Sequence, residues 1–408
     1  MGIDGKTAGL KRALLVAGAV AGAALAPWSA PAEVAPAVVQ PAEAPVPIAV
    51  AWSAEAIEQL LAAIDGAQAE GLNPSDYSPA RLRAAAAAGA GAELDALANA
   101  SAMALARDYY LGRVGDRSTM DWLIERSPYE TAQLASRLNA AVAAGDLAGF
   151  YAALLPADPR YAALRAALVD APDKAARDRL RANMERWRWM PRTLGTNYLY
   201  VNMPSYQLRV INDGQPMSTY TVVVGARDTP TPQLATPTSS LVVNPWWNVP
   251  QSIVQKSNLR PGRGGYLFKA NGDGSYMVRQ PPGPRNSLGR IKFNLANDQA
   301  IYLHDTPAKA LFARDQRALS HGCIRVKDID QLAAELMGYG GDPAQLDDAL
   351  AGSGTATLRL PRTWQVYLVY FTVDADEAGT LTAYGDPYGR DAELIARLDG
   401  RPLQMASR

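Results

Sequence analysis

The chain has 408 residues, which is enough for two ordinary domains with separate hydrophobic cores. Its 40 basic and 40 acidic side chains cancel, so nothing indicates nucleic-acid binding through a bulk basic field. The single cysteine excludes an intramolecular disulfide, and a lone thiol does not indicate a compartment.

The first residues have the pattern of an export signal. Lys11 and Arg12 precede an uncharged run over 13–26, and the Ala-Pro-Ala of residues 30–32 resembles a cleavage site. The run is too short to span a bilayer comfortably, although an uncleaved membrane anchor stays open as the alternative. We therefore expect a signal peptide at 1–32 and an exported protein, with membrane association only if the signal is uncleaved.

Two segments follow before the composition changes. Residues 33–50 are rich in Pro and Ala, which predicts an extended, semi-rigid linker. Residues 51–190 carry apolar residues at helical spacing, with Ser53 as the expected N-cap of the first helix and Pro79 as the first residue of another. No histidine or cysteine occurs in this part, so we interpret it as a helical scaffold.

Period-two alternation begins after Gly195 and predicts a β-rich domain over 196–373. Asn212-Asp213-Gly214 is a strong hairpin signal between two strands. Residues 255–290 are rich in Gly, Pro, Arg and Asn, and are too long for an ordinary connection, so we predict a lid. A strand and a helix in 374–408 should pack on this domain. The expected fold class is α+β and multidomain, with an all-α scaffold before a β-sandwich-like catalytic domain.

The candidate chemistry lies in Ser320-His321-Gly322-Cys323-Ile324-Arg325-Val326, which contains the single cysteine and one of two histidines. A cysteine with a histidine base is the minimal set for thiol catalysis. Gly322 suits a tight turn whose N–H groups converge on an oxyanion, and an imidazole beside the thiol favours the thiolate.

The other histidine, His304, ends a predicted strand over Ala300–His304. Spacing alone leaves open whether His304 or His321 is the base. A zinc site made of both histidines and Cys323 is the rival interpretation, because catalytic zinc uses three ligands of these types. His-x-Cys is not a usual ligand spacing, and no CxxC or HExxH pattern accompanies it.

The run from Tyr302-Leu303-His304-Asp305 to Ser320-His321-Gly322-Cys323-Ile324-Arg325 resembles the signature of the L,D-transpeptidase (YkuD-type) catalytic domain. The resemblance extends to 280–289 and 244–250, and 183–191 is similar to the Gram-negative subgroup with a helical scaffold domain. It implies that Cys323 is the nucleophile, that His304 is the base and that a backbone carbonyl at Asp305 orients it. It also implies that His321, Gly322 and Cys323 form the oxyanion-binding turn.

The resemblance implies a periplasmic enzyme that takes peptidoglycan stem peptides as donor and acceptor and forms 3→3 cross-links through a thioester. It implies inhibition by carbapenem β-lactams, and no metal or organic cofactor. Alternatives within the same chemistry are an L,D-carboxypeptidase, D-amino-acid exchange or attachment of a protein to the wall. A non-catalytic wall-binding scaffold is the rival of another class. The expected substrate-binding residues are Ser320, Arg325, Tyr302, Asn286, Arg285, Trp246, Trp247 and Tyr266.

Overall fold

The computed structural model describes residues 51–126, 133–260, 265–272, 274–376 and 378–400, all of which fall within one compact unit, residues 43–408. The predicted signal peptide (1–32) and linker (33–50) lie outside the described residues, as does the end of the C-terminal segment. Within the described ranges, no helix combines the length and the apolar character that a membrane span requires.

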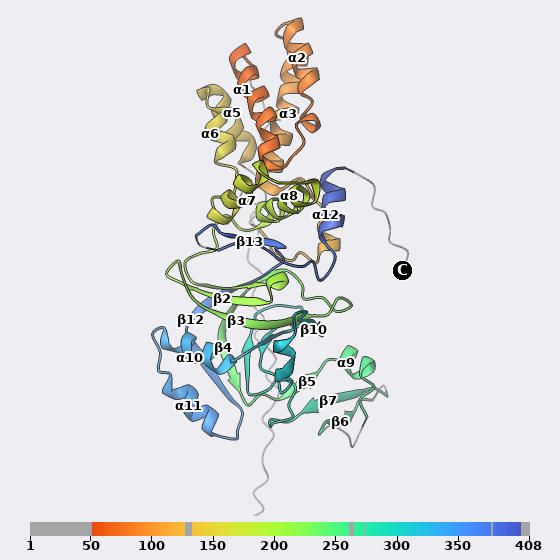
Figure 1. Ribbon diagram of the computed structural model, residues 1–408, viewed down its shortest axis with the longest axis vertical. Helices are drawn as coiled ribbons and strands as arrows, with labels where there is room; N and C mark the ends of the chain where they lie inside the picture. The colour runs from red at the N-terminus through yellow and green to blue at the C-terminus, as the bar shows by residue number, and fades with distance from the viewer. Residues whose placement is uncertain (1–50, 127–132, 261–264, 273, 377, 401–408) are drawn as a thin grey trace, which may run out of the picture. The chain divides into compact units, whose positions relative to one another are not determined.

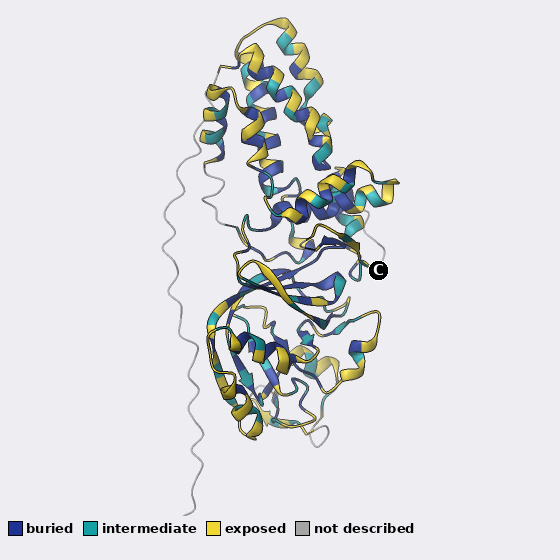
Figure 2. Ribbon diagram, turned by 60° about the vertical axis from the view of Figure 1, so that its left-hand side comes forward, coloured by how far each residue is buried: buried dark blue, intermediate teal, exposed yellow. Residues whose placement is uncertain are grey.

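Helices fill the first part of the described chain, as their apolar spacing predicts (Figure 1). Ser53 caps the first helix, because its side chain accepts a hydrogen bond from the N–H of Ala56 at 3.1 Å. Buried apolar side chains lie between the helices and exposed residues lie on the outer faces (Figure 2). The helices are α1 (Ala54–Gly66), α2 (Pro79–Ala88), α3 (Ala92–Leu111), α5 (Leu134–Ala144) and α6 (Leu147–Ala152).

Two further helices, α7 (Pro159–Val169) and α8 (Lys174–Trp189), contact the β-rich part directly. Both share a hydrophobic core with β-strand residues, and the rings of Trp187 and Phe371 lie 5.0 Å apart. The C-terminal helix α12 (Asp391–Leu398) packs on α8 and joins the same core. Residues from three distant parts of the sequence therefore bury one another here.

A nine-stranded sheet forms the β-rich part, in the order β10-β3-β11-β9-β8-β4-β12-β1-β2. Strand β2 also pairs with β3, so the sheet closes on itself, whereas the sequence predicted a sandwich-like arrangement within the same β-rich class. Closure pairs the backbone groups of strands that would otherwise be edges. The strands are β1 (Tyr198–Asn202), β2 (Gln207–Asn212), β3 (Gln215–Gly225), β4 (Leu234–Val243), β8 (Ile291–Asn294), β9 (Leu303–His304), β10 (Ala318–Ser320), β11 (Ile324–Val326) and β12 (Ala356–Val369).

The predicted hairpin joins β2 to β3. Asn212 pairs with Gln215, and Asp213 and Gly214 between them both have positive φ values, 51° and 76°. This is the backbone conformation that matches a two-residue turn to the twist of its strands. Helices α10 (Ile329–Gly338) and α11 (Ala344–Ala351) pack against the sheet, and β13 (Val373–Ala375) pairs with β14 (Leu381–Ala383).

The predicted lid is a small folded element rather than a loop alone. Strands β5 (Trp247–Val249), β7 (Tyr276–Gln280) and β6 (Leu267–Ala270) form a separate three-stranded sheet, and α9 (Gln251–Lys256) packs on it. The element thus begins before the predicted boundary at 255. Figure 1 shows it apart from α10 and α11. The lid element has a small hydrophobic core of its own, formed by Trp247, Val249, Val278 and Leu288. Its strands are too short for period-two spacing to predict them from the sequence.

Candidate active site

A cavity of about 510 Å³ opens between the lid element and the closed sheet. Residues of the lid element and of the closed sheet line this cavity. Segments that lie far apart in the sequence therefore contribute to one site. Of the residues predicted from the sequence, those that line it are Cys323, His304, His321, Ser320, Arg325, Tyr302, Trp247 and Tyr266.

The turn between β10 and β11 carries the cysteine, and hydrogen bonds within the turn fix its shape. The buried hydroxyl of Ser320 donates to the carbonyl of Cys323 at 2.6 Å and accepts from the N–H of Gly322 at 3.1 Å. Gly322 has φ +116°, a conformation that L side chains rarely adopt. The hydroxyl of Ser320 thus has a donor and an acceptor within the turn and shapes it, while the substrate-binding role of Ser320 stays a prediction.

Residues from outside the signature also hydrogen-bond to the turn or to the strand next to it. The hydroxyl of Thr231 donates to the carbonyl of Gly322 at 2.6 Å and accepts from the N–H of Gly225 at 2.8 Å. Tyr388 donates to the carbonyl of Gly225 at 2.8 Å. The signature alone identifies neither Thr231 nor Tyr388, because both come from other parts of the chain.

His304 is buried, and its Nδ1 is hydrogen-bonded to the carbonyl of Asp305. A carbonyl only accepts, so Nδ1 carries the proton and Nε2 has a free lone pair in the neutral ring. Burial first, and then the charge of Arg325, lower the pKa of His304 to about 3. The imidazole is therefore neutral near pH 7, which a general base requires.

The side chain of Asp305 faces a different set of partners. It accepts from the N–H of Arg290 at 2.9 Å and forms an ion pair with Lys309. The contact to His304 uses the backbone carbonyl of Asp305, as the resemblance implied. The catalytic role of that contact stays a prediction.

Strand register brings His304 and Cys323 to the same side of the sheet. Strand β11 lies parallel to β9, with Arg325 opposite His304 and Ile324 opposite Leu303. Leu303 and Ile324 are fully buried in the core, whereas the residues that flank them line the cavity. Because side chains alternate along a strand, the cavity side receives Tyr302, His304 and Arg325 together, with Cys323 just before β11.

The thiol of Cys323 is half-buried and points toward the carbonyl of Ala300, 3.6 Å from Sγ. Burial raises the pKa of the Cys323 thiol, while hydrogen bonds from Tyr302 and the charges of Lys292 and Arg325 favour the thiolate. Within the described residues, no hydrogen bond joins this thiol to His304. Catalytic hydrogen bonds of ligand-free enzymes commonly tighten only in the substrate complex.

His321 lies at the exposed rim of the cavity, unlike the buried His304. Partial burial, then the charges of Arg325 and Lys256, lower its pKa, while Asp228 raises it. The two histidines therefore occupy different environments, a distinction that spacing left open. Across the described residues, no group of three or more His, Cys, Asp or Glu side chains is arranged to hold a metal ion.

Three predicted substrate-binding residues do not line the cavity. Asn286 is 1% exposed, and its amide donates to the carbonyls of Pro245 and Pro281, each at 2.9 Å, so it holds a loop together. Arg285 is exposed outside the cavity. Trp246 is 39% exposed, with the guanidinium of Arg279 over its ring at 4.7 Å. Sequence reasoning could not separate these residues from Trp247, because the direction of each side chain depends on the lid fold.

Lys292 is a residue of the site that sequence reasoning missed. It lies in β8 between the buried Ile291 and Phe293, and it pairs with His304 across to β9. Its ammonium lies 4.4 Å from the centroid of the Tyr302 ring. The alternation of the short segment 291–294 is the sequence signal that could have placed Lys292 on the face of the sheet opposite to the buried Ile291 and Phe293.

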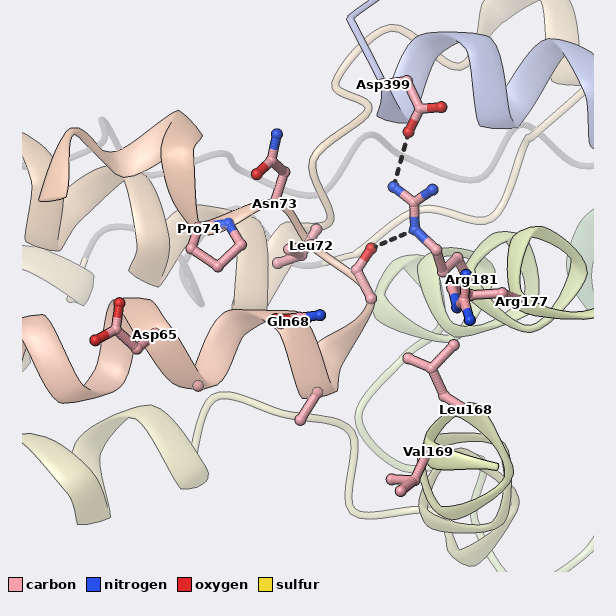
Figure 3. A pocket seen from close by; sticks show the side chains of 13 residues that line it. Asp65, Gln68, Leu72, Asn73, Pro74, Leu168, Val169, Arg177, Arg181 and Asp399 are labelled. Atoms are coloured by element: carbon pink, nitrogen blue, oxygen red, sulfur yellow. Dashed lines mark hydrogen bonds and ion pairs between the residues drawn. The ribbon is translucent and has the colours of Figure 1, made fainter. Parts of the chain in front are cut away.

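A larger cavity, of about 1000 Å³, lies among α1, α7, α8 and α12 (Figure 3). Arg181 crosses one side of it, donating to the carbonyl of Gly71 at 2.8 Å and pairing with Asp399 at 2.9 Å. Its lining includes neither a thiol nor an imidazole, so the smaller cavity is the one with nucleophile and base.

The chain therefore has a helical domain followed in sequence by a β-rich domain. In the β-rich domain, one cysteine and one buried, neutral histidine line a common cavity. Residues 196–355 match the L,D-transpeptidase catalytic domain family (YkuD), and residues 48–168 match the scaffold domain family. The chain therefore combines a YkuD-type L,D-transpeptidase catalytic domain with an N-terminal scaffold domain, as its sequence signature predicted.

A Haemophilus influenzae protein, provisionally named as an L,D-transpeptidase, is 32% identical over an alignment of 241 positions, and the match covers 53% of this chain. The match spans 48% of that relative, about half its length.

Solved structures of the same family are more distant. An L,D-transpeptidase from Mycobacterium smegmatis is 13% identical and covers 42% of this chain and 58% of its own, with a TM-score of 0.24. Mycobacterium tuberculosis L,D-transpeptidase 1 is 13% identical, with 42% and 60% covered and a TM-score of 0.21. The ertapenem-acylated catalytic domain from E. faecium L,D-transpeptidase is 14% identical, with 43% and 99% covered and a TM-score of 0.20.

Proposed function

We propose that this protein is an exported peptidoglycan L,D-transpeptidase that forms 3→3 cross-links through a thioester on Cys323. The observation that carries the proposal is that this thiol and a buried imidazole, whose tautomer leaves Nε2 free, line the same cavity. The catalytic-domain match over 196–355 supports the reaction class, and the signal-like residues 1–32 support export to the periplasm.

In the proposed first step, Sγ of Cys323 attacks the carbonyl carbon of the diaminopimelate at position three of a tetrapeptide stem. Nε2 of His304 takes the thiol proton and passes it to the departing amino group of the terminal D-Ala. The peptide C–N bond breaks and a thioester remains. An acceptor amine, deprotonated by Nε2, then attacks the thioester, which forms the new amide and regenerates the thiol.

The negative charge on the tetrahedral oxygen needs preorganised donors. The N–H of Gly322 is engaged by Ser320, so the proposed oxyanion donors are the N–H groups of His321 and Cys323 in the same turn. Gly322 then contributes through its backbone conformation. Arg325, whose buried Nε has no hydrogen-bond partner among the described residues, is the proposed guanidinium for a stem-peptide carboxylate or carbonyl.

The acceptor distinguishes the candidate functions of this site. Water as acceptor would make the protein an L,D-carboxypeptidase, and a free D-amino acid or a protein amine would make it an exchange or attachment enzyme. Purified protein incubated with tetrapeptide muropeptides and analysed by mass spectrometry resolves them. We expect cross-linked dimers, and tripeptide as the sole product would refute the cross-linking proposal.

Cys323→Ala is the control for the chemistry. Because this is the single cysteine of the chain, the variant should lose every acylated species. A carbapenem should add its mass to the wild-type protein and not to the variant, as measured by intact-protein mass spectrometry. If Cys323→Ala turned over substrate at the wild-type rate, the thioester mechanism would be refuted. The turn that carries Cys323 would then not supply the nucleophile.

A further inference from the structure

We propose that Lys292 is a positioning residue of the acylation step: its ammonium, held by β8 over the ring of Tyr302, stabilises negative charge on Cys323. The proposal rests on the proposed thioester chemistry, and it assigns a function to a residue outside the sequence signature.

The first argument is geometric. Three neighbouring strands place Lys292 (β8), His304 (β9) and Arg325 (β11) in one row, because Lys292 pairs with His304 and His304 pairs with Arg325. Side chains opposite one another in neighbouring strands lie on the same face of the sheet. The histidine therefore stands between two cations, and the cysteine lies beside the end of the row.

The second argument is the path from Lys292 to the thiol. The ammonium lies 4.4 Å from the Tyr302 ring centroid, and the Tyr302 and His304 rings lie 5.5 Å apart in an edge-on arrangement. A cation over an aromatic face fixes both partners. Tyr302 in turn hydrogen-bonds to the sulfur and favours its charged form. Lys292 thus acts on Cys323 both by its charge and through the position of Tyr302.

The third argument is the balance of charge around the thiol. The groups that line the cavity around the thiol are Tyr302 just before β9, His304 in β9, His321 in the turn and Arg325 in β11. Lys292 in β8 is paired with His304, and its charge acts on the thiol. The nearby carboxylates are paired elsewhere, Asp305 with Lys309 and Asp228 with Lys256. The cations Lys292 and Arg325 thus oppose part of the effect of burial, which disfavours a thiolate and is the larger influence on the pKa of Cys323.

The test is the pH dependence of alkylation of Cys323 by iodoacetamide. The thiolate displaces iodide and forms a thioether, so the rate reports thiol ionisation without requiring transpeptidation. The chain has a single cysteine, so every alkylation event occurs at the site. We compare the wild type with Lys292→Met, Lys292→Gln and Lys292→Arg. Lys174→Met, which removes an exposed ammonium from α8, is the matched control.

Removing the ammonium should shift the midpoint of the alkylation profile upward by about one pH unit in Lys292→Met and Lys292→Gln. Lys292→Arg and Lys174→Met should keep the wild-type midpoint. Circular dichroism identifies folded variants, and Lys292→Gln provides the measurement if Lys292→Met does not fold. An unchanged midpoint in the folded neutral variants would overturn the proposal even if turnover falls, because packing alone would then explain the loss. An equal shift in Lys174→Met would also overturn it.

If the midpoint shifts as expected but muropeptides are not cross-linked, the electrostatic role of Lys292 stands and the proposed function fails. If cross-linking occurs and the midpoint stays unchanged, the proposed function stands and the electrostatic role of Lys292 fails. The two proposals can therefore fail independently.

Discussion

At the scale of single residues, the buried imidazole of His304 links the chemistry of the site to the stability of the protein. Its Nδ1 is committed to the carbonyl of Asp305, and burial holds its pKa at about 3. The unfolded chain exposes the ring, which then binds a proton with an ordinary pKa near 6.5. Below that pH, the unfolded state therefore takes up a proton that the folded state excludes.

This difference predicts an acid-sensitive contribution to stability. It is fully present above about pH 6.5 and is lost as the pH falls toward 3, because the folded pKa is the depressed one. Between pH 7 and pH 5, the wild type should lose about 2 kcal/mol more of its free energy of unfolding than His304→Asn, which keeps a donor for the Asp305 carbonyl. Urea unfolding at both pH values measures the difference.

His321→Asn is the matched control, because His321 lies at the exposed rim and should leave the wild-type pH dependence almost intact. Parallel pH curves for the wild type and His304→Asn would show that His304 is not held neutral by the fold.

At the scale of elements, the lid is a folded unit with its own core, and Asn286 is its main polar connection to the neighbouring loop. Its amide donates to the carbonyls of Pro245 and Pro281, and its Oδ1 accepts from the N–H of Leu288 at 2.8 Å. A buried amide with four backbone partners, the fourth being the carbonyl of Gln280 at 3.3 Å, positions the chain segments that meet at it. The Trp247 and Tyr266 rings, 6.3 Å apart, depend on those segments to form one wall of the cavity.

Asn286→Ala should therefore behave as a structural variant. Leaving buried carbonyls without their donors costs about 1–3 kcal/mol, so the free energy of unfolding should fall by that amount. Hydrogen exchange should increase across β5 and β7 before the main sheet exchanges. Arg285→Ala, at the exposed neighbouring position, is the control and should change stability by no more than about 0.5 kcal/mol. A variant with normal lid protection but weaker substrate binding would restore the original prediction of a direct contact.

At the scale of the whole molecule, α8 packs on the β-rich part through apolar contacts and contains a buried ion pair between two of its own residues. Its Trp187 packs on Phe371 of the sheet side. Arg188 is paired with the fully buried Glu185 at 2.9 Å and also donates to the hydroxyl of Tyr161 at 3.1 Å. The second carboxylate oxygen of Glu185 accepts from the N–H of Val114 at 2.8 Å. The ion pair thus lies within the core that both parts share.

Glu185→Ala should leave the guanidinium of Arg188 buried without its partner, which costs about 3–5 kcal/mol. The loss should appear in the unfolding of α7, α8 and α12 and of the sheet together, because these elements share this core. Far-UV circular dichroism and tryptophan fluorescence during urea unfolding measure the two parts, and their transitions should move together. Glu93→Ala, on the exposed first turn of α3, is the control and should stay within about 0.5 kcal/mol of the wild type. Separate transitions would contradict a shared core.

The residues near Cys323 could be predicted from the sequence, because the nucleophile, the turn glycine and the histidine lie in one short, ordered pattern whose chemistry depends on residue type. The helical part could be predicted for a similar reason: capping and apolar spacing are local properties, as Ser53 illustrates. The lid sheet, the closure between β2 and β3 and the structural role of Asn286 could not, because each depends on contacts between segments far apart in the chain. The same holds for the row of Lys292, His304 and Arg325. Strand register decides which side chains share a face, and packing decides that His304 is buried whereas His321 lies at the rim. Residue spacing alone could therefore not separate the two histidines, and only the resemblance to a family did so before the structure.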